Sequence, residues 1–195
     1  SSDPVVEPVT LSSFSGKTAS ATIRNVPTGD YVVVETVRNG PDANLYTVNE
    51  ESSKNVTVTP DGGEATLTNT YTRKTGTLAI EKKIPAEDWS AVPDGYSGTI
   101  DYAGGQTDSE KTGSVTFSKN DFKQDQNGDY VKTWSITVPT GTYTVTEDES
   151  TANITDYART ISYFNGSDAS KQVTVSANGN ATVTVTNDYE IEKGT

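Results

Sequence analysis

Short segments of alternating apolar and polar residues follow one another along the chain, and no segment has a helical periodicity of useful length. In the clearest segment, Gly76–Ile84, residues Leu78, Ile80 and Ile84 occupy alternate positions and therefore share one face of a predicted β-strand. The predicted strands of the first part of the chain are residues 8–14, 18–25, 30–37, 45–49, 54–59 and 64–71. Those of the second part are residues 77–84, 97–103, 113–118, 130–138, 142–148, 157–164, 171–176 and 180–188. The pattern predicts an all-β protein.

Two stretches of the sequence occur twice, which indicates an internal repeat. Val26–Glu35 matches Val138–Glu147, and both begin with Val-Pro-Thr-Gly. Ala65–Tyr71 matches Ala181–Tyr189, and both end in Thr-Asn-x-Tyr. The repeat predicts two copies of the same domain.

The repeat places a domain boundary in Thr72–Thr75. We predict two tandem β-sandwich domains, residues 1–74 and 75–195. Gly194-Thr195 follows the second copy as Gly76-Thr77 follows the first, so we expect the chain to continue into a third copy. The first domain has no room for a strand equivalent to Gly76–Ile84 ahead of its Val-Pro-Thr-Gly.

The composition narrows the class of protein. The 195 residues are only 31% hydrophobic and carry a net charge of −12 without a basic cluster, which argues against nucleic acid and anionic membranes as partners. The absence of Cys and His excludes disulfides, Cys-His and Ser-His catalysis and most zinc sites. No apolar run approaches a membrane span, and no signal peptide is present. A β protein rich in Thr and turns but without Cys suggests an extracellular location.

Three polar residues interrupt apolar strand faces. Lys82 shares the face of Leu78 and Ile80, Glu147 follows Tyr143 and Val145 in register, and Asn187 follows Val183 and Val185. A buried lysine is costly unless its amine is paired, neutral or chemically consumed. The predicted strands therefore carry an amine, a carboxyl and a carboxamide toward one core.

These three groups permit a spontaneous isopeptide bond. Burial lowers the pKa of a lysine and raises that of a glutamate, so a neutral Lys82 amine can attack the side-chain carbonyl of Asn187. Glu147 would donate a hydrogen bond to that carbonyl and act as the catalytic proton shuttle while ammonia leaves. Two other interpretations remain open: a buried Lys82–Glu147 ion pair with Asn187 as a hydrogen-bonding neighbour, or a position of these groups at a sheet edge.

The chain resembles tandem Cna-B-type domains, which are immunoglobulin-like modules of Gram-positive surface adhesins and pilus shafts. The residues that carry the resemblance are Leu78–Lys83, Tyr143–Asp148 and Val183–Tyr189. It covers the second domain and roughly the last fifty residues of the first. The resemblance implies two immunoglobulin-like sandwiches, with Lys82 and Asn187 as the cross-linked pair and Glu147 as its catalyst.

The resemblance implies a structural stalk or pilus shaft, extracellular and anchored to the cell wall or within a pilus. Its expected partners are neighbouring repeats or pilus subunits, and no cofactor or metal is expected. The alternative is an adhesin module that binds host matrix or glycan through loops or through an exposed Trp89 face. An enzyme is a third class, but the sequence has no convergent catalytic motif apart from the self-directed bond formation.

The first domain retains two of the three groups. Glu35 shares a face with Tyr31 and Val33, and Asn69 shares one with Leu67 and Tyr71. No matching lysine strand is present, because Lys17, Lys54 and Lys74 all lie outside an alternating first strand. We predict no internal bond in this domain. Three resolutions remain open: a strand in a removed upstream segment, a strand from a neighbouring molecule, or water in the gap.

Two further motifs favour structural roles. Asp125–Asp129 begins like a calcium loop, but Tyr130 replaces the required Gly and no bidentate Glu follows, so a polar hairpin turn is the better interpretation. Trp134 alternates with Ile136 and Val138, which favours core packing over a sugar-binding platform. No sorting signal or pilin lysine motif identifies a sortase linkage.

Overall fold

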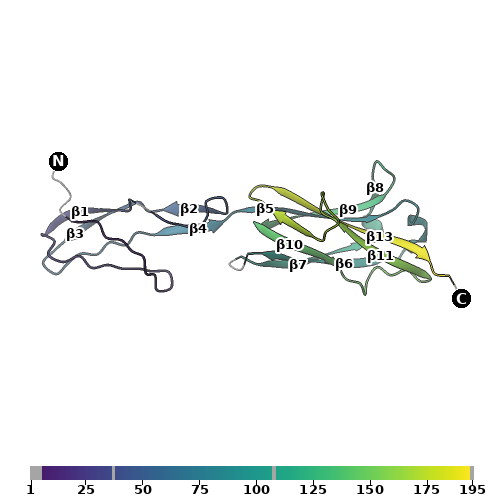
Figure 1. The fold of residues 1–195 in the computed structure, drawn as a ribbon, viewed down its shortest axis with the longest axis horizontal. Coiled ribbons are helices and arrows are strands. Elements are labelled where there is room, and N and C mark those ends of the chain that lie inside the picture. Colours follow the sequence, from purple (N-terminus) through teal and green to yellow (C-terminus); the bar gives the residue numbers. More distant parts are fainter. Residues whose placement is uncertain (1–5, 37, 107–108, 194–195) are drawn as a thin grey trace. The chain divides into compact units, whose positions relative to one another are not determined.

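A computed structural model describes residues 6–36, 38–106 and 109–193 of the chain. The described residues form β-strands and only two short 3-10 turns, which confirms the all-β prediction (Figure 1). The chain divides into two compact units: unit 1 comprises Ser1–Gly40 with Val48–Tyr71, and unit 2 comprises Pro41–Thr47 with Thr72–Thr195. Gly194 and Thr195, which suggested a third copy, lie outside the described residues. No helix in the described part of the chain is long and apolar enough to cross a membrane.

Unit 2 is built from two β-sheets, one with the strand order β11-β13-β5-β9-β8 and one with the order β12-β10-β6-β7 (Figure 1). All eight strands predicted for this part of the sequence are present, and β8 was not predicted. The strands are β5 (Thr75–Ile84), β6 (Ser97–Gly105), β7 (Lys111–Ser118), β8 (Lys123–Gln124), β9 (Tyr130–Pro139), β10 (Gly141–Glu147), β11 (Tyr157–Phe164), β12 (Gln172–Val175) and β13 (Asn180–Ile191). The 3-10 turns are η1 (Trp89–Ala91) and η2 (Lys119–Asp121).

The first and last strands of unit 2 lie side by side. β13 pairs with β5 in parallel, from Asn180 opposite Thr77 to Thr186 opposite Lys83. The other edge of β5 pairs with β9 in antiparallel orientation. β5 is therefore a central strand, and it connects the beginning of unit 2 to its end.

The core of unit 2 lies between the two sheets, where the alternating apolar residues of β5, β10 and β13 meet. On β5, Leu78, Ile80 and Ile84 are fully buried, whereas Glu81 and Lys83 on the other face are partly exposed. Period-two alternation thus holds along β5, as it does along β10 and β13. The hydrophobic side chains buried with them include Val92, Tyr96, Ile100, Phe117, Phe122, Val138, Tyr143, Val145, Val175, Val183, Val185 and Tyr189.

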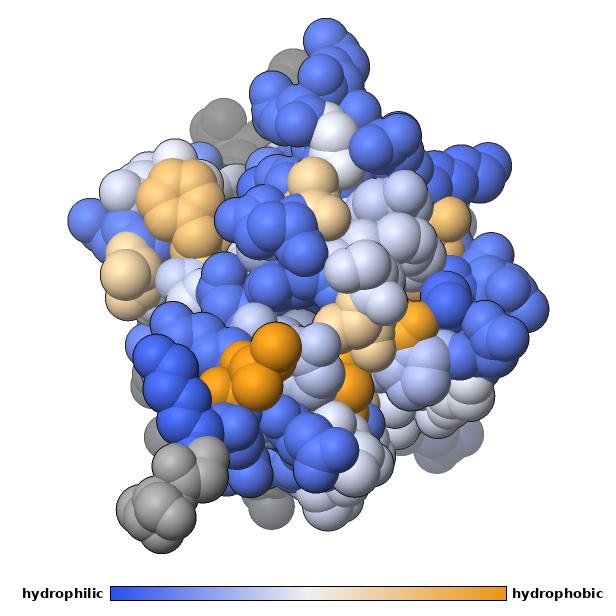
Figure 2. Space-filling model, turned by 90° about the vertical axis from the view of Figure 1, so that its right-hand side faces the viewer, coloured by the Kyte–Doolittle hydropathy of each residue, from blue (hydrophilic) through white to orange (hydrophobic). Residues whose placement is uncertain are grey.

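The surface of the molecule is predominantly hydrophilic on the face shown in Figure 2, where hydrophobic residues occur only in small separate groups. The strong negative charge of the chain agrees with this, since a net charge of −12 favours solubility. That face offers no large apolar patch among the described residues.

The N-terminal part of the chain repeats the local structure of unit 2. β1 (Gly29–Val34) pairs with β3 (Ser53–Val58), and β2 (Tyr46–Glu50) pairs with β4 (Asn69–Arg73). The Tyr31 hydroxyl donates to the Pro27 carbonyl at 2.8 Å, as the Tyr143 hydroxyl does to the Pro139 carbonyl at 2.8 Å. The two Val-Pro-Thr-Gly segments therefore form the same turn and the same strand start.

The strands predicted for residues 8–14 and 18–25 are wrong. These segments form no strand, and only an isolated bridge joins Ser15 to Thr18 between them. Their apolar side chains are exposed, with Phe14 the most exposed at 63%. An alternating segment needs a neighbouring strand to satisfy its backbone groups. Residues 18–25 correspond in the repeat to β9, whose partner is β5, and no described strand of unit 1 corresponds to β5.

The strands predicted for residues 30–37, 45–49 and 54–59 differ from the structure only in their ends, whereas most of the strand predicted for residues 64–71 is not formed. Residues 64–68 lie outside β4, which begins at Asn69, and β1 ends at Val34. Val37, the last residue of the predicted 30–37 strand, lies outside the described residues. No described residue of unit 1 is buried, so packing against a core does not extend its strands.

We expect Gly104→Ala to destabilise unit 2, because β6 and β10 approach each other too closely for a side chain there. An added Cβ would overlap the Thr142 carbonyl oxygen and would lie 2.6 Å from the Tyr143 Cα. Since both neighbours are backbone atoms, the expected loss is roughly 3 kcal/mol of unfolding free energy. Thermal or urea unfolding measures it. Gly95→Ala is the matched control, because nothing lies within 4 Å of its added Cβ; equal losses in both variants would contradict the argument.

Candidate functional site: a buried amine, carboxylate and carboxamide

Three polar side chains meet in the hydrophobic core of unit 2. Lys82 and Asn187 are 0% exposed and Glu147 is 1% exposed. Lys82 comes from β5 and Asn187 from the neighbouring β13, while Glu147 comes from β10 in the facing sheet. The structure thus brings together the three residues that interrupt the apolar strand faces.

The Lys82 amine is surrounded by few polar atoms. Its Nζ donates a hydrogen bond to the Val185 carbonyl at 3.3 Å, on the neighbouring strand. Nζ also lies 5.8 Å from the centre of the Phe117 ring. These contacts offer one carbonyl and one aromatic face to a group that has three N–H donors when charged.

Glu147 lies between the two nitrogen atoms of the site. Its Oε2 is 3.0 Å from Lys82 Nζ, and this contact raises the pKa of the lysine against the larger lowering effect of burial. Its Oε1 accepts a hydrogen bond from Asn187 Nδ2 at 2.7 Å. One carboxylate therefore touches both the amine and the carboxamide nitrogen, one oxygen to each.

The Asn187 carboxamide presents its nitrogen to Glu147 and not its oxygen. The sequence predicts that Glu147 donates to the carbonyl, whereas in the structure Glu147 Oε1 accepts from Asn187 Nδ2. The nitrogen is the donor side of a carboxamide, so it is the side that an acceptor oxygen contacts. Asn187 Oδ1 is buried and has no hydrogen-bond partner.

Arg159 is a member of the site that the sequence analysis missed. Its Nη1 lies 3.3 Å from Glu147 Oε1, and its guanidinium also donates to the Thr151 and Glu149 carbonyls. The side chain is only 7% exposed. Arg159 alternates with Tyr157 and Ile161 on β11. The same period-two alternation that identifies Lys82 therefore also places Arg159 on an apolar strand face.

Two tyrosines complete the surroundings of the carboxamide. Asn187 Nδ2 lies 3.2 Å from the Tyr189 hydroxyl and 3.4 Å from the Tyr96 hydroxyl. The two hydroxyls are themselves 2.8 Å apart. Tyr189 follows Asn187 in register on β13, but Tyr96 lies in the segment between η1 and β6, where no sequence pattern points to it.

The protonation of Lys82 reflects its burial. Desolvation lowers its pKa from 10.5 to about 8, against the raising effect of the Glu147 charge and with a smaller lowering effect from Arg159. The unfolded chain keeps the ordinary pKa, so between about pH 8 and 10.5 it binds more protons than the folded chain. Before any cross-link forms, stability therefore rises with pH across that window, and the neutral amine becomes accessible near pH 8.

The predicted calcium-like segment forms a hairpin turn between β8 and β9. Asp125 Oδ1 accepts the backbone N–H groups of Asn127 and Asp129 at 2.8 and 3.0 Å. The Asp129 carboxylate pairs with Lys83. Asp125 is thus committed within the turn and Asp129 to Lys83, and no group of three residues suited to a metal occurs in the described part of the chain.

The two tryptophans pack against the core. Trp134 is partly buried, with its ring 6.5 Å from that of Phe117. Trp89 stacks on Tyr130, with ring centres 3.8 Å apart and an interplanar angle of 5°, and it also contacts Phe122. Tyr130 therefore covers one face of the Trp89 ring, on which the binding alternative depends.

Unit 1 contains a related pair of side chains. Asn69 Nδ2 donates to both carboxylate oxygens of Glu35, at 2.9 and 3.1 Å. Asn69 Oδ1 is buried and unpartnered, like the carboxamide oxygen in unit 2. Lys54 pairs with Glu51 and Lys74 donates to the Ala43 carbonyl, and no lysine in the described residues contacts the Glu35–Asn69 pair.

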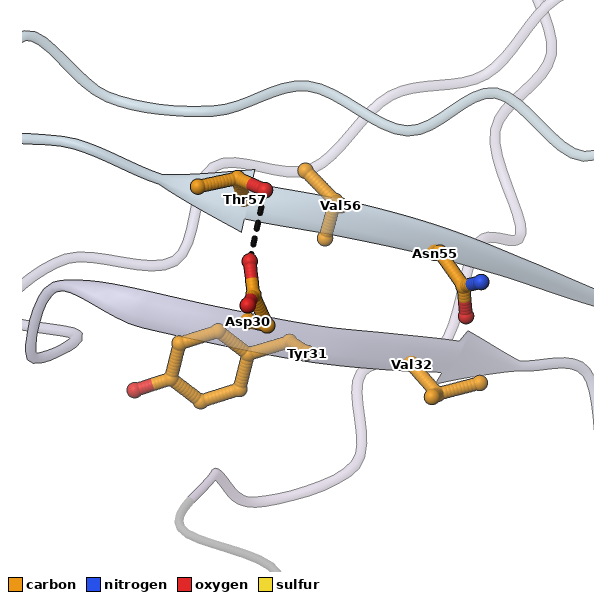
Figure 3. Close-up of a pocket in the computed structure, with 6 residues that line it drawn as sticks. All are labelled: Asp30, Tyr31, Val32, Asn55, Val56 and Thr57. Atoms are coloured by element: carbon orange, nitrogen blue, oxygen red, sulfur yellow. Dashed lines mark hydrogen bonds between the residues drawn. The ribbon is translucent and has the colours of Figure 1, made fainter.

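A concave surface on unit 1 lies over the β1–β3 pair (Figure 3). Asp30, Tyr31 and Val32 line it from β1, and Asn55, Val56 and Thr57 from β3. The Asp30 carboxylate accepts a hydrogen bond from the Thr57 hydroxyl at 2.7 Å, so these two polar groups satisfy each other (Figure 3). The surface does not bring together a set of groups that would hold a specific ligand.

Comparisons with known proteins give a family but not a function. Residues 78–190 match a family described as a domain of unknown function (DUF5979). No curated protein matches the chain. The major pilin from Streptococcus pyogenes is 16% identical with a TM-score of 0.30 over 86% of this chain and 72% of that chain. A point mutant of the same pilin is 15% identical with a TM-score of 0.31, over 85% of this chain and 71% of that chain. Since the family match spans more than half of the residues, this chain belongs to the DUF5979 domain family.

Proposed function

We propose that unit 2 is a structural domain that carries mechanical force, and that its first and last strands become joined by an isopeptide bond between Lys82 Nζ and the side-chain carbonyl carbon of Asn187. The observation that carries this proposal is the burial of an amine, a carboxylate and a carboxamide at contact distance in one apolar core. Proximity of this kind replaces a cofactor, because the fold holds the reacting groups in place.

The position of Glu147 suits a proton shuttle. When the neutral Lys82 amine attacks the Asn187 carbonyl carbon, the amine must lose a proton and the carboxamide nitrogen must gain one. Glu147 Oε2 lies beside the first nitrogen and Oε1 beside the second. A single carboxylate can therefore receive the proton from one nitrogen and deliver it to the other, and ammonia leaves.

A permanent buried ion pair is the competing interpretation of the same contacts. Two charges in an apolar core carry a desolvation cost that their attraction repays only when further hydrogen bonds satisfy them. Here the carboxamide oxygen beside the pair, Asn187 Oδ1, is buried without a hydrogen-bond partner. Bond formation removes the lysine charge and leaves a neutral amide, so it relieves a desolvation cost that an ion pair retains.

The topology suits a mechanical role. β5 begins unit 2 and β13 ends it, and the two strands are parallel neighbours. A force that enters near Gly76 and leaves near Ile191 pulls these strands past each other. A covalent link between Lys82 and Asn187 carries that force directly, and the strands between them stay folded.

The wider role we propose is that of a stalk or pilus-shaft segment outside the cell. The resemblance to Cna-B-type domains supports this interpretation, together with a hydrophilic, acidic chain without Cys. Its partners would be neighbouring repeats or subunits of the same assembly, and its location the cell wall or a pilus. The two domains, residues 1–74 and 75–195, would follow one another as immunoglobulin-like repeats.

The binding alternative, an adhesin that contacts host matrix or glycan through loops, has less support. Trp89 is stacked on Tyr130, and the concave surface over β1 and β3 has its polar pair satisfied internally. We therefore keep the stalk as the proposed function.

We expect the intact mass of the folded protein to be about 17 Da below the sequence mass, because one ammonia is lost when Lys82 and Asn187 join. Mass spectrometry of the intact chain, followed by peptide mapping, measures this. Glu147→Gln keeps the shape of the side chain but cannot accept the proton, so this variant should fold and retain the full mass. A wild-type mass equal to the sequence mass would contradict the proposal. Ammonia loss in Glu147→Gln would show that Glu147 is not the proton shuttle.

We expect Lys82→Ala and Asn187→Ala to lower the melting temperature and to lengthen the extension of unit 2 under force. The bond closes a loop of about a hundred residues, which by analogy with a disulfide is worth roughly 4–5 kcal/mol. In the wild type the cross-link prevents that loop from extending. Single-molecule pulling should therefore give a contour length about 350 Å greater in the variants. Asn187→Ala keeps the Lys82 stem in place and thus separates cross-link loss from packing loss. Equal extension in wild type and variants would contradict the mechanical role.

We expect Asn69 to retain its carboxamide in this chain. Glu35 and Asn69 are positioned as in unit 2, but the described structure brings no amine to them. Peptide mapping should therefore find an unmodified Asn69. A second ammonia loss that maps to Asn69 and to Lys17, Lys54 or Lys74 would show the prediction to be wrong.

A further inference from the structure

We propose that the hydroxyls of Tyr96 and Tyr189, together with the Glu147 carboxylate, form a three-oxygen cradle that holds the ammonia released from Asn187. The inference rests on the proposed cross-link and assigns a role to two residues outside the amine, carboxylate and carboxamide set. It makes the two tyrosines catalytic residues, since their hydroxyls touch the nitrogen that leaves.

The cradle is defined by three distances from one atom. Asn187 Nδ2 lies 2.7 Å from Glu147 Oε1, 3.2 Å from the Tyr189 hydroxyl oxygen and 3.4 Å from the Tyr96 hydroxyl oxygen. The three oxygens belong to three different segments, β10, β13 and the segment before β6. Nδ2 is therefore surrounded by acceptors from separate parts of the fold.

The number of acceptors matches the leaving group better than the carboxamide. A carboxamide nitrogen has two N–H groups, so three oxygen acceptors exceed what it can use. When Nδ2 gains the proton that Glu147 delivers, it carries three N–H groups, one for each oxygen. Interactions that become complete only as the reaction proceeds lower the barrier, because they stabilise the transition state more than the ground state.

The hydroxyls are held so that their oxygen lone pairs face Nδ2. The Tyr189 hydroxyl donates to the Ala152 carbonyl at 2.6 Å. With that proton committed, the Tyr96 hydroxyl donates to Tyr189 across their 2.8 Å contact. Both O–H bonds thus point away from the carboxamide, and both oxygens remain acceptors for it.

The environment keeps the hydroxyls neutral and dry. Tyr96 is 2% exposed and Tyr189 is 5% exposed. Desolvation by burial raises the pKa of both hydroxyls, so neither loses its proton at ordinary pH. They accept hydrogen bonds without becoming charged, and Glu147 alone moves the proton.

The Lys82 nitrogen forms a bond to the Asn187 carbonyl carbon and gives one proton to Glu147 Oε2. The neutral carboxyl group then turns so that this O–H faces Nδ2 and gives the same proton to Nδ2. The bond from the carbonyl carbon to Nδ2 breaks, and its electron pair leaves with ammonia. Asn187 Oδ1 remains a carbonyl oxygen, and the tyrosines neither gain nor lose protons.

The test follows cross-link formation in newly made protein. Four proteins are synthesised in a cell-free system: wild type, Tyr96→Phe, Tyr189→Phe and Tyr143→Phe. Samples are quenched with acid at successive times, and the mass of the intact chain is measured by mass spectrometry. We expect each of the first two substitutions to slow ammonia loss on the order of 10-fold, as expected for one lost hydrogen bond to a group that gains charge. Tyr143→Phe is the matched control, because its buried hydroxyl binds the Pro139 carbonyl, and it should react at the wild-type rate.

Folding is separated from chemistry by circular dichroism at the reaction temperature. Tyr96→Phe is the more informative variant, because the Tyr189 hydroxyl keeps its bond to the Ala152 carbonyl. Folded Tyr96→Phe and Tyr189→Phe chains that cross-link at the wild-type rate would overturn the cradle and leave the proposed function intact. A wild-type chain that never loses ammonia would overturn the proposed function itself.

Discussion

The burial of the Lys82 amine is the constraint on which the rest of unit 2 depends. An amine in an apolar core is tolerated only when its charge is compensated or removed, and both routes need Glu147 at 3.0 Å. Glu147 in turn needs Arg159 and the Asn187 carboxamide around its second oxygen. Because these groups come from both sheets, the relative position of the sheets and the register of β5 against β13 are tied to one polar cluster.

That cluster lies where the topology makes a covalent link most useful. The strands that begin and end unit 2 are parallel neighbours, so a bond between them spans nearly the whole unit. The proposed link from Lys82 to Asn187 would carry the load through a single covalent path, and it would convert a costly buried charge into a neutral amide.

Unit 1 repeats local sequence features of unit 2, but none of its described strands corresponds to β5. The Val-Pro-Thr-Gly turn, the tyrosine that binds it and the Glu35–Asn69 pair all recur. The strand that would carry an amine has no counterpart in the described residues, and no described residue of unit 1 is buried. The N-terminal part thus forms the antiparallel strand pairs β1–β3 and β2–β4 and the Glu35–Asn69 side-chain pair, but a core needs the central strand that β5 supplies in unit 2.

The strands of unit 2 other than β8, and the faces on which Lys82, Glu147 and Asn187 lie, follow from the sequence, because period-two alternation is a local property of an extended chain. The alternation at residues 8–14 and 18–25 predicts two strands that the structure does not contain, because a strand forms only beside a neighbouring strand. Only the packing of the two sheets brings Tyr96 into the site, places Arg159 against Glu147 and sets Glu147 against the carboxamide nitrogen. These contacts join residues far apart in the chain, and they depend on how two sheets pack, which no local pattern records.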